Sequence, residues 1–390
     1  MRPRASLPVA ALAATLALAA LTGCTRNQPA GAGAASEGGI TVTAADDSCA
    51  VSTATATSGT SVFSVTNTGT RATEFELVAK DGLTIVGEIE NIGPGLTRSL
   101  SVQAQPGSYT TMCKPGMTGS GVGRAAFTVT GEAVALSGDA KQLADAAATR
   151  YVSYVRDQAD QLLTATRAFA ASYASGDAAT AKTEYPAARA YYERIEPIAE
   201  SFGDLDPQLD AREGDVAEGA DWTGWHRIEK DLWAPDGKPL DGAAREQAAE
   251  FLVEKTQDLK DRVDAASFTV TADAISNGAI GLLDEVASSK ITGEEEAYSH
   301  TDLWDFKANV EGAEVAYRGV RDIAAGKDAA LVRSLDARFA ALDALLARYG
   351  SLEKGFQPYT DLSKADVKAL SDSVNALAEP LSRLTAAVLG

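Results

Sequence analysis

The chain has 390 residues, with 35 basic and 54 acidic side chains and a net charge of −19. Such a charge repels the phosphates of nucleic acids and anionic headgroups, so nucleic acid is excluded as an expected partner. Apolar residues make up 45% of the chain, which is enough to build the cores of more than one domain.

Residues 1–23 predict an export signal. An apolar run from Val9 to Leu21 follows two arginines and is too short to cross a bilayer core of about 30 Å as a helix. The run ends in LTGC, which resembles the lipobox of bacterial lipoproteins and predicts a lipid on Cys24. The small, polar residues 24–38 predict a flexible tether. We therefore expect an extracytoplasmic lipoprotein anchored to the cell membrane.

Residues 39–131 predict a β-sandwich. Seven short segments rich in valine, threonine and isoleucine alternate in polarity, and turn pairs such as Pro94-Gly95 and Pro106-Gly107 separate some of them. This alternation is typical of strands with one buried face.

Two cysteines of this β domain, Cys49 and Cys113, allow two interpretations. Export favours a disulfide between them. Alternatively, their thiolates bind copper or iron together with Met112 or Met117 and Glu74 or Glu76. Residues 39–131 contain no histidine, so a blue-copper site with two histidines and a cysteine is excluded within them.

Residues 140–390 predict an all-α helix bundle. Apolar residues such as Tyr151, Val155 and Leu162 recur at helical spacing, and strand-like alternation is rare. The Gly- and Asp-rich residues 203–221 predict a loop. Further helices are expected at about 222–233, 242–264, 268–288, 304–324, 327–348 and 363–388.

The segment GWHRIEKDLW contains one of only two histidines in the chain, His226, three residues before Glu229. Residues i and i+3 share a helix face, so both side chains can reach one metal ion. An imidazole with the ordinary pKa of about 6.5 predicts binding that weakens towards about pH 5. The alternative is an ordinary helix with Trp225 and Trp233 in the core.

Acidic residues accompany this motif in neighbouring segments. Glu193 and Glu196 are three residues apart and are expected on one helix face, whereas Asp210 and Glu296 lie in acidic stretches further along the chain. Solvated faces and helix capping are the alternative explanations of these residues.

Three stretches, residues 191–215, 224–233 and 290–313, together with the cysteine segments of the β domain, resemble the EfeO family of iron-uptake components. The resemblance implies a cupredoxin-like β-sandwich followed by an imelysin-type helical domain. It also implies iron, as Fe²⁺ or Fe³⁺, bound by His226 and Glu229, with weaker candidate ligands at Glu193, Glu196, Asp210 and Glu296. The implied partners are an iron permease and a Dyp-type haem peroxidase.

We therefore expect a multidomain β + α protein that is not an enzyme but captures iron and delivers it to a permease. Carboxylates with one imidazole also suit zinc, and the β domain is a candidate for copper. The alternative is a zinc-dependent metallopeptidase built on the HxxE motif. Zinc peptidases of the His-Glu-x-x-His type have two histidines four residues apart, and this segment has one.

Overall fold

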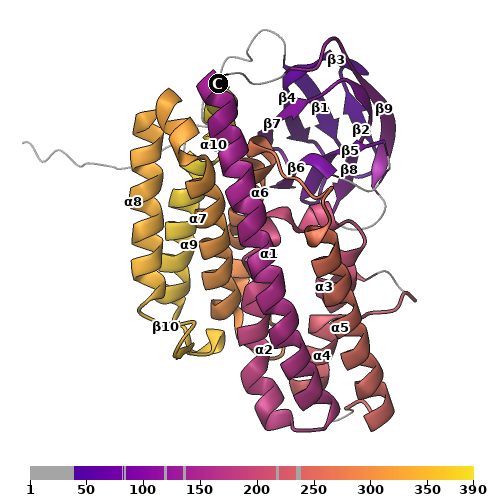
Figure 1. Ribbon diagram of the computed structural model, residues 1–390, viewed down its shortest axis with the longest axis vertical. Coiled ribbons are helices and arrows are strands. Elements are labelled where there is room, and N and C mark those ends of the chain that lie inside the picture. Colours follow the sequence, from indigo (N-terminus) through magenta and orange to yellow (C-terminus); the bar gives the residue numbers. More distant parts are fainter. Residues whose placement is uncertain are drawn as a thin grey trace, which may run out of the picture. The chain divides into compact units, whose positions relative to one another are not determined.

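The structure is a computed structural model that describes residues 39–390, apart from 81, 83–84, 118–120, 135–137, 217–218 and 234–238. The expected signal (1–23), the expected tether (24–38) and Cys24 lie outside the described residues. The described chain forms an N-terminal β domain and a helical domain, as the sequence predicts (Figure 1). Within it, no helix is long and apolar enough to cross a membrane.

The strands of the β domain form two facing sheets. One has the order β2-β1-β4-β7 and the other β3-β9-β8-β5-β6. Their bounds are β1 Ile40–Ala44, β2 Cys49–Val51, β3 Thr55–Thr57, β4 Gly59–Asn67, β5 Thr73–Ala79, β6 Ile85–Ile92, β7 Thr97–Ala104, β8 Gly107–Pro115 and β9 Val122–Thr130.

The sandwich core consists of the residues that alternate inward from both sheets. Phe63 of β4 lies between Phe75 of β5 and Phe127 of β9, with ring centroids 5.1 and 5.5 Å away. All seven expected strands are present. The sequence did not reveal β2 and β3, because three residues are too few to show an alternating pattern.

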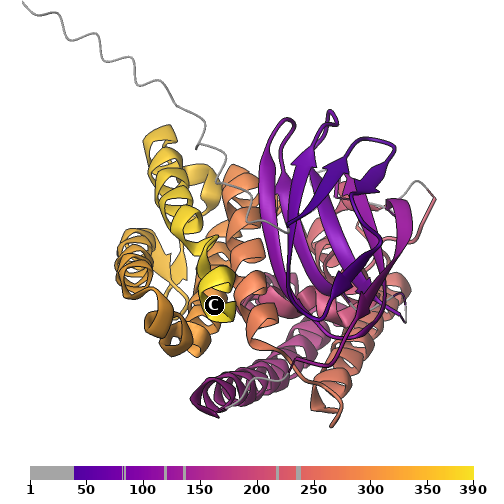
Figure 2. The same ribbon diagram turned by 90° about the horizontal axis from the view of Figure 1, so that it is seen from above.

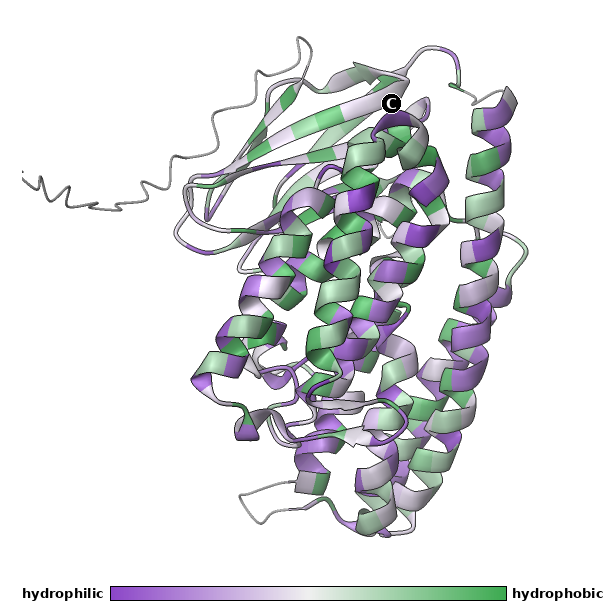
Figure 3. Cartoon of the chain, turned by 90° about the vertical axis from the view of Figure 1, so that its left-hand side faces the viewer, coloured by the Kyte–Doolittle hydropathy of each residue, from purple (hydrophilic) through white to green (hydrophobic). Residues whose placement is uncertain are grey.

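The helical domain is built from long amphipathic helices whose apolar faces meet. In Figure 3, apolar and polar residues lie on different faces of these helices. The α-helices are α1 Gly138–Ala174, α2 Ala178–Glu193, α3 Leu205–Asp210, α4 Trp225–Trp233, α5 Gly242–Asp264, α6 Ala272–Ser288, α7 Asp302–Lys327, α8 Ala329–Leu346, α9 Lys364–Leu381 and α10 Leu384–Leu389. Short 3₁₀ turns lie at Glu196–Phe202, Glu213–Asp215, Lys290–Thr292 and Tyr359–Asp361, and a small hairpin joins β10 Gly350–Ser351 to β11 Gly355–Phe356.

Two departures from the expected helices shape the candidate site. Helix α2 ends at Glu193, because Pro197 has no backbone N–H to donate to the Glu193 carbonyl four residues before it. Glu193 therefore ends α2 and Glu196 begins the next 3₁₀ turn. The expectation of one continuous helix is wrong, although Lys290 contacts both carboxylates. The expected loop at 203–221 contains α3, which carries Asp210 at its last position.

Helix α6 joins the two domains, because it packs against β6 and β7. Figure 2 shows the helices to one side of the β domain. The Arg98 guanidinium of β7 donates to both carboxylate oxygens of Asp284 on α6, with Nη2 2.9 Å from Oδ1. The backbone N–H of Gln103 donates to the Asp273 carboxylate at 2.8 Å. These bonds fix β7, the edge strand of its sheet, against the helical domain.

Candidate metal centre

Helix α4 places His226 and Glu229 on one buried face. The side chains are 2% and 0% exposed, and His226 Nδ1 lies 3.2 Å from Glu229 Oε2. The i, i+3 spacing produces this contact, as the sequence predicts. Trp225 is fully buried and stacks on Phe169 with ring centroids 5.3 Å apart, so it packs the helix.

The turn before α4 requires a glycine. Gly224 has a φ of 84°, and a Cβ there would lie 2.1 Å from the carbonyl oxygen of Leu209. Only glycine allows both this backbone conformation and this close approach. The start of α4 therefore lies against the end of α3, which brings His226 beside Asp210.

The two nitrogens of the His226 ring face different carboxylates. Nε2 lies 3.6 Å from Asp210 Oδ1 and 3.7 Å from Glu295 Oε1, whereas Nδ1 lies 4.0 Å from Glu296 Oε1 as well as beside Glu229. Among the described residues, the groups able to hold a metal ion are Asp210–His226–Glu295 and His226–Glu229–Glu296. Within the same residues, the buried Nε2 has no hydrogen-bond partner.

Both oxygens of the Glu229 carboxylate are engaged. Oε1 accepts hydrogen bonds from the backbone N–H groups of Tyr298 and Ser299 at 2.8 and 2.7 Å, and Oε2 faces His226 Nδ1. Burial favours the neutral acid, but the bond to His226, its charge and the backbone donors hold the pKa of Glu229 below its ordinary value. Glu229 is therefore a fixed carboxylate that orients the imidazole.

Two buried cations stand among these carboxylates. Arg189 is fully buried, with Nε 2.7 Å from Glu296 Oε1, and it also forms ion pairs with Glu193 and Asp210. Lys290 is 3% exposed, and its Nζ lies 3.7 Å from Glu295 Oε1. Neither residue was predicted from the sequence. Arg189 follows Tyr185 by four residues on a buried face of α2, and a lone arginine at such a position is the signal that could have revealed it.

Glu193 and Glu196 pair with these cations instead of facing His226. Lys290 Nζ lies 3.2 Å from Glu193 Oε2 and 2.6 Å from Glu196 Oε1, and Asn309 donates to both carboxylates. Neither glutamate belongs to a group of potential ligands around His226 within the described residues. The structure thus brings together His226, Glu229, Asp210 and Glu296 from the predicted ligands, adds Glu295, and leaves Glu193 and Glu196 outside.

The carboxylates change the protonation of His226. Burial and the Arg189 guanidinium favour the neutral ring, but the bond to Glu229 and the nearby carboxylates of Glu295 and Asp210 outweigh them and raise the pKa of His226 to about 10. The expectation of an ordinary imidazole pKa is therefore wrong for the metal-free chain. A metal ion must displace a proton from this ring at neutral pH.

Negative charge in the cluster is only partly neutralised. Burial and the nearby Glu229 carboxylate raise the pKa of Glu296 to about 8, against the effect of Arg189. Burial and Glu296 raise the pKa of Asp305 above its ordinary value. Neither oxygen of the buried Asp305 has a hydrogen-bond partner among the described residues, although Arg189 Nε lies 3.6 Å from Oδ1. Buried carboxyl groups with such perturbed pKa values mark a candidate functional site.

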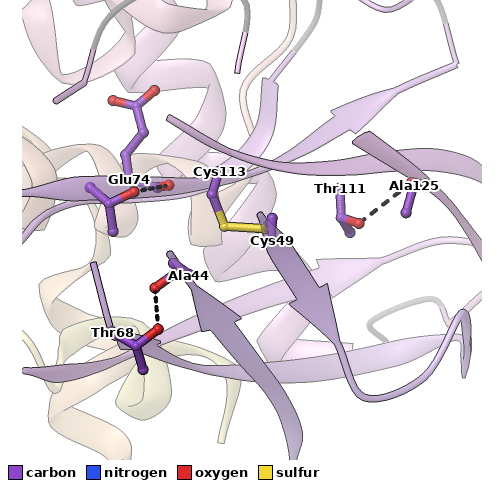
Figure 4. The surroundings of a disulfide bond; sticks show 8 residues. Ala44, Cys49, Thr68, Glu74, Thr111, Cys113 and Ala125 are labelled. Atoms are coloured by element: carbon purple, nitrogen blue, oxygen red, sulfur yellow. Dashed lines mark hydrogen bonds between the residues drawn. A yellow bond between two sulfur atoms is a disulfide. The ribbon is translucent and has the colours of Figure 1, made fainter. Parts of the chain in front are cut away.

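In the β domain, Cys49 of β2 and Cys113 of β8 form a disulfide with Cα atoms 5.5 Å apart. Of the two interpretations of this cysteine pair, a disulfide or a thiolate metal site, the structure has the disulfide. Successive residues of a strand point to opposite faces, so Met112 and Cys113 face opposite ways. Figure 4 shows the Glu74 side chain pointing away from the disulfide. The four residues therefore do not form one metal site.

Lys114 holds the two buried glutamates on the outer face of β5. It pairs with Glu74 at 2.8 Å and also with Glu76. Burial raises the pKa of Glu74 to about 8, although Lys114 opposes it. Among the described residues, no group of potential ligands includes a residue of the β domain. With both cysteines in the disulfide, the thiolate site does not form, and copper or iron in the β domain stays a prediction.

Comparison with known proteins identifies the class. Residues 147–384 match the imelysin family, and residues 9–122 match the cupredoxin-like domain family. The imelysin match contains α2, α3, α4 and α7, which surround His226, and covers more than half of the chain.

Curated relatives match over most of their length. The protein named iron uptake system component EfeO in Escherichia coli (strain K12) is 39% identical over 351 residues, which cover 88% of this chain and 90% of the relative. The protein of the same name in Yersinia pestis is 38% identical, with the same coverage. The chain belongs to the EfeO-type proteins of the imelysin family, with a cupredoxin-like domain before the imelysin domain.

Proposed function

We propose that this chain binds iron as the cargo of an uptake system and holds it at His226. The observation that carries the proposal is the buried Nε2, which has no hydrogen-bond partner in the described part of the chain and lies 3.6 and 3.7 Å from the carboxylate oxygens of Asp210 and Glu295. The names of the relatives, which are iron uptake system components, support the choice of iron.

The distances suit a metal ion after little rearrangement. Ligand bonds of about 2.1 Å from one ion to Nε2 and to a carboxylate oxygen span 3.6 Å at an angle of about 120°, near trigonal or tetrahedral values. One imidazole with carboxylates suits Fe²⁺, Fe³⁺ or Zn²⁺ rather than Cu⁺, which prefers sulfur.

In this arrangement Glu229 positions the histidine and does not bind the metal. An Nδ1–H that donates to Glu229 leaves the Nε2 lone pair for the ion, once Nε2 has lost its proton. A carboxylate that fixes the second ring nitrogen is the usual support of a metal-bound histidine. The proposal thus departs from the sequence-based expectation that His226 and Glu229 both ligate.

We also infer the wider role from the family. The chain captures iron outside the cytoplasm and passes it to an iron permease, with a Dyp-type haem peroxidase as the second partner and a lipid on Cys24 as the anchor. The charge of −19 supports a cation as cargo, because a negative field concentrates cations at the surface.

A peptidase is a poorer fit to the same residues. A zinc hydrolase needs a general base that can take a proton from water. Glu229 of the HxxE motif has both oxygens engaged by His226 and by two backbone N–H groups. We therefore assign the chain a binding role and no catalysis.

Anaerobic calorimetry with Fe²⁺ tests the proposal. The wild type is expected to bind at one site in the helical domain, and His226→Ala is expected to lose that binding. The control is His300→Asn, which removes the other histidine. Its φ of 58° is a conformation that asparagine tolerates, so this variant is expected to bind as the wild type does. Unchanged binding by His226→Ala would refute the proposal.

A further inference from the structure

A cavity of about 580 Å³ lies between the β domain and the helical domain. The outer face of β5 contributes Glu74 and Glu76 to its wall, α3 contributes Asp206 and Asp210, and Glu285 and Glu295 line it from the side of α6 and the segment before α7. No role in the proposed function requires Glu74, Glu76, Asp206 or Glu285.

The lining is strongly acidic. Among the described residues, eleven acidic and three basic side chains line the cavity. Acidic partners already engage the basic groups Lys114 and Arg212: Lys114 pairs with Glu74 and Glu76, and Arg212 Nη1 lies 2.9 Å from Glu295 Oε2. Walls of one sign focus the field inside a cleft and raise the local concentration of the opposite charge.

The cavity leads to the candidate iron site. Asp210 and Glu295 belong to its wall, and the same two carboxylates lie 3.6 and 3.7 Å from His226 Nε2. The imidazole is 2% exposed, and this nitrogen has no hydrogen-bond partner among the described residues. An unpaired, buried donor atom therefore stands behind the acidic wall. The unpaired Nε2 therefore supports a cation site separately from the acidic lining of the cavity.

We propose that the cavity is the route by which iron reaches His226, and that it admits the hydrated cation and rejects anionic iron chelates. The inference rests on the proposed function and adds the form of the cargo. The β domain then has a role without binding a metal itself, because its outer face supplies the second acidic wall.

The charge of the cavity walls, and not the volume of the cavity, selects the hydrated cation over an anionic chelate. A water molecule occupies about 30 Å³ in the liquid, so the six waters of a hydrated ion need about 180 Å³. The cavity of about 580 Å³ also has room for a small organic chelate. A chelate such as ferric citrate carries carboxylates of its own and meets like charge on both walls, whereas hydrated Fe²⁺ meets opposite charge.

Stopped-flow mixing of the purified chain with Fe²⁺ under anaerobic conditions tests the route, with quenching of tryptophan fluorescence as the signal. The variant is Glu285→Lys, which reverses a charge on the wall at a residue without a ligand role. Its association rate at low salt is expected to fall about tenfold and to approach the wild-type rate at high salt, because steering is screened. Glu285→Gln is expected to show a smaller decrease in association rate. It replaces Glu285→Lys in the test if the lysine variant does not fold.

The matched control is Glu379→Lys on α9. This residue is exposed and does not line the cavity, so the same change of net charge is expected to leave the rate near that of the wild type. Equal rates for both Glu285 variants and the wild type would overturn the inference. Binding of ferric citrate by the wild type at a rate similar to that of Fe²⁺ would overturn it as well.

The two proposals fail in different ways. If His226→Ala binds Fe²⁺ as the wild type does, the proposed function is wrong. If His226→Ala loses binding while Glu285→Lys associates as fast as the wild type, the site stands and only the route is wrong.

Discussion

His226 suits a binding site because its two ring nitrogens have different surroundings. Nδ1 faces a carboxylate that backbone donors hold in place, whereas Nε2 is buried beside Asp210 and Glu295 and has no hydrogen bond to any described residue. The sequence predicts the pair His226–Glu229, because i, i+3 spacing on a helix is a local relation. It cannot predict that Asp210 and Glu295 complete the group, because long-range packing sets those distances.

The first prediction at this scale concerns Glu229→Gln. A positioning role predicts that Fe²⁺ affinity, measured by calorimetry, falls about 10- to 100-fold without being lost. Glu250→Gln, on the exposed side of α5, is the control and is expected to bind normally. If Glu229→Gln loses binding as completely as His226→Ala, Glu229 is a ligand and the assignment of Nε2 is wrong.

The second prediction is a pH dependence. With the pKa of His226 raised to about 10, iron must displace a proton throughout the neutral range. Affinity is therefore expected to rise about tenfold per pH unit between about pH 6 and 8. Anaerobic titrations at several pH values measure this slope. A plateau above about pH 7, as an ordinary imidazole would give, would contradict it.

Among the elements, the helices and strands with long periodic patterns could be predicted, and the short ones could not. The strands and long helices were expected from alternation and helical spacing. Helix α3, with six residues, lies within an expected loop, yet it carries Asp210. The roles of Arg189 and Lys290 could not be predicted either, because the carboxylates that allow their burial come largely from other elements.

The turn between α3 and α4 supplies a prediction at this scale. In Gly224→Ala, the added Cβ would clash with the Leu209 carbonyl oxygen 2.1 Å away, and the backbone would be strained at a φ of 84°. Either α4 moves or the fold loses about 1–3 kcal/mol. We expect weaker Fe²⁺ binding and a lower unfolding temperature, measured by calorimetry and circular dichroism. Gly326→Ala, with open space around the site, is the control.

The disulfide supplies the other prediction for the elements. Cys49 lies in one sheet and Cys113 in the other, 64 positions further along the chain. Removing a link that closes a loop of this length is expected to cost about 4 kcal/mol. Urea unfolding of Cys49→Ser/Cys113→Ser measures the loss. The denatured Cys24→Ser chain, left unreduced, is expected to show no free thiol, and two thiols would contradict the bond.

At the scale of the whole molecule, the sequence predicts the two domains and the acidic charge. It does not predict the cavity that residues of both domains line. The order of a β domain and a helical domain follows from the change of period along the chain and is confirmed. The contact of α6 with β6 and β7, including Arg98–Asp284, depends on two surfaces that no local pattern relates.

Anchoring is also a property of the whole molecule. If Cys24 carries the lipid, Cys24→Ser is expected to release the protein from membranes or leave it unprocessed, because the acyl chains supply the membrane affinity. Cell fractionation followed by mass determination measures both outcomes. A variant that is processed and fractionates with membranes as the wild type does would show that Cys24 is not the anchor.

The most direct test of the central claim is the position of iron in crystals of the chain grown or soaked with Fe²⁺, located by anomalous scattering at the iron edge. The account predicts one strong peak about 2.1 Å from His226 Nε2, with Asp210 and Glu295 in the coordination sphere and Glu229 on the opposite side of the ring. A peak bound by Nδ1 and Glu229, or one that lies away from His226, would contradict it.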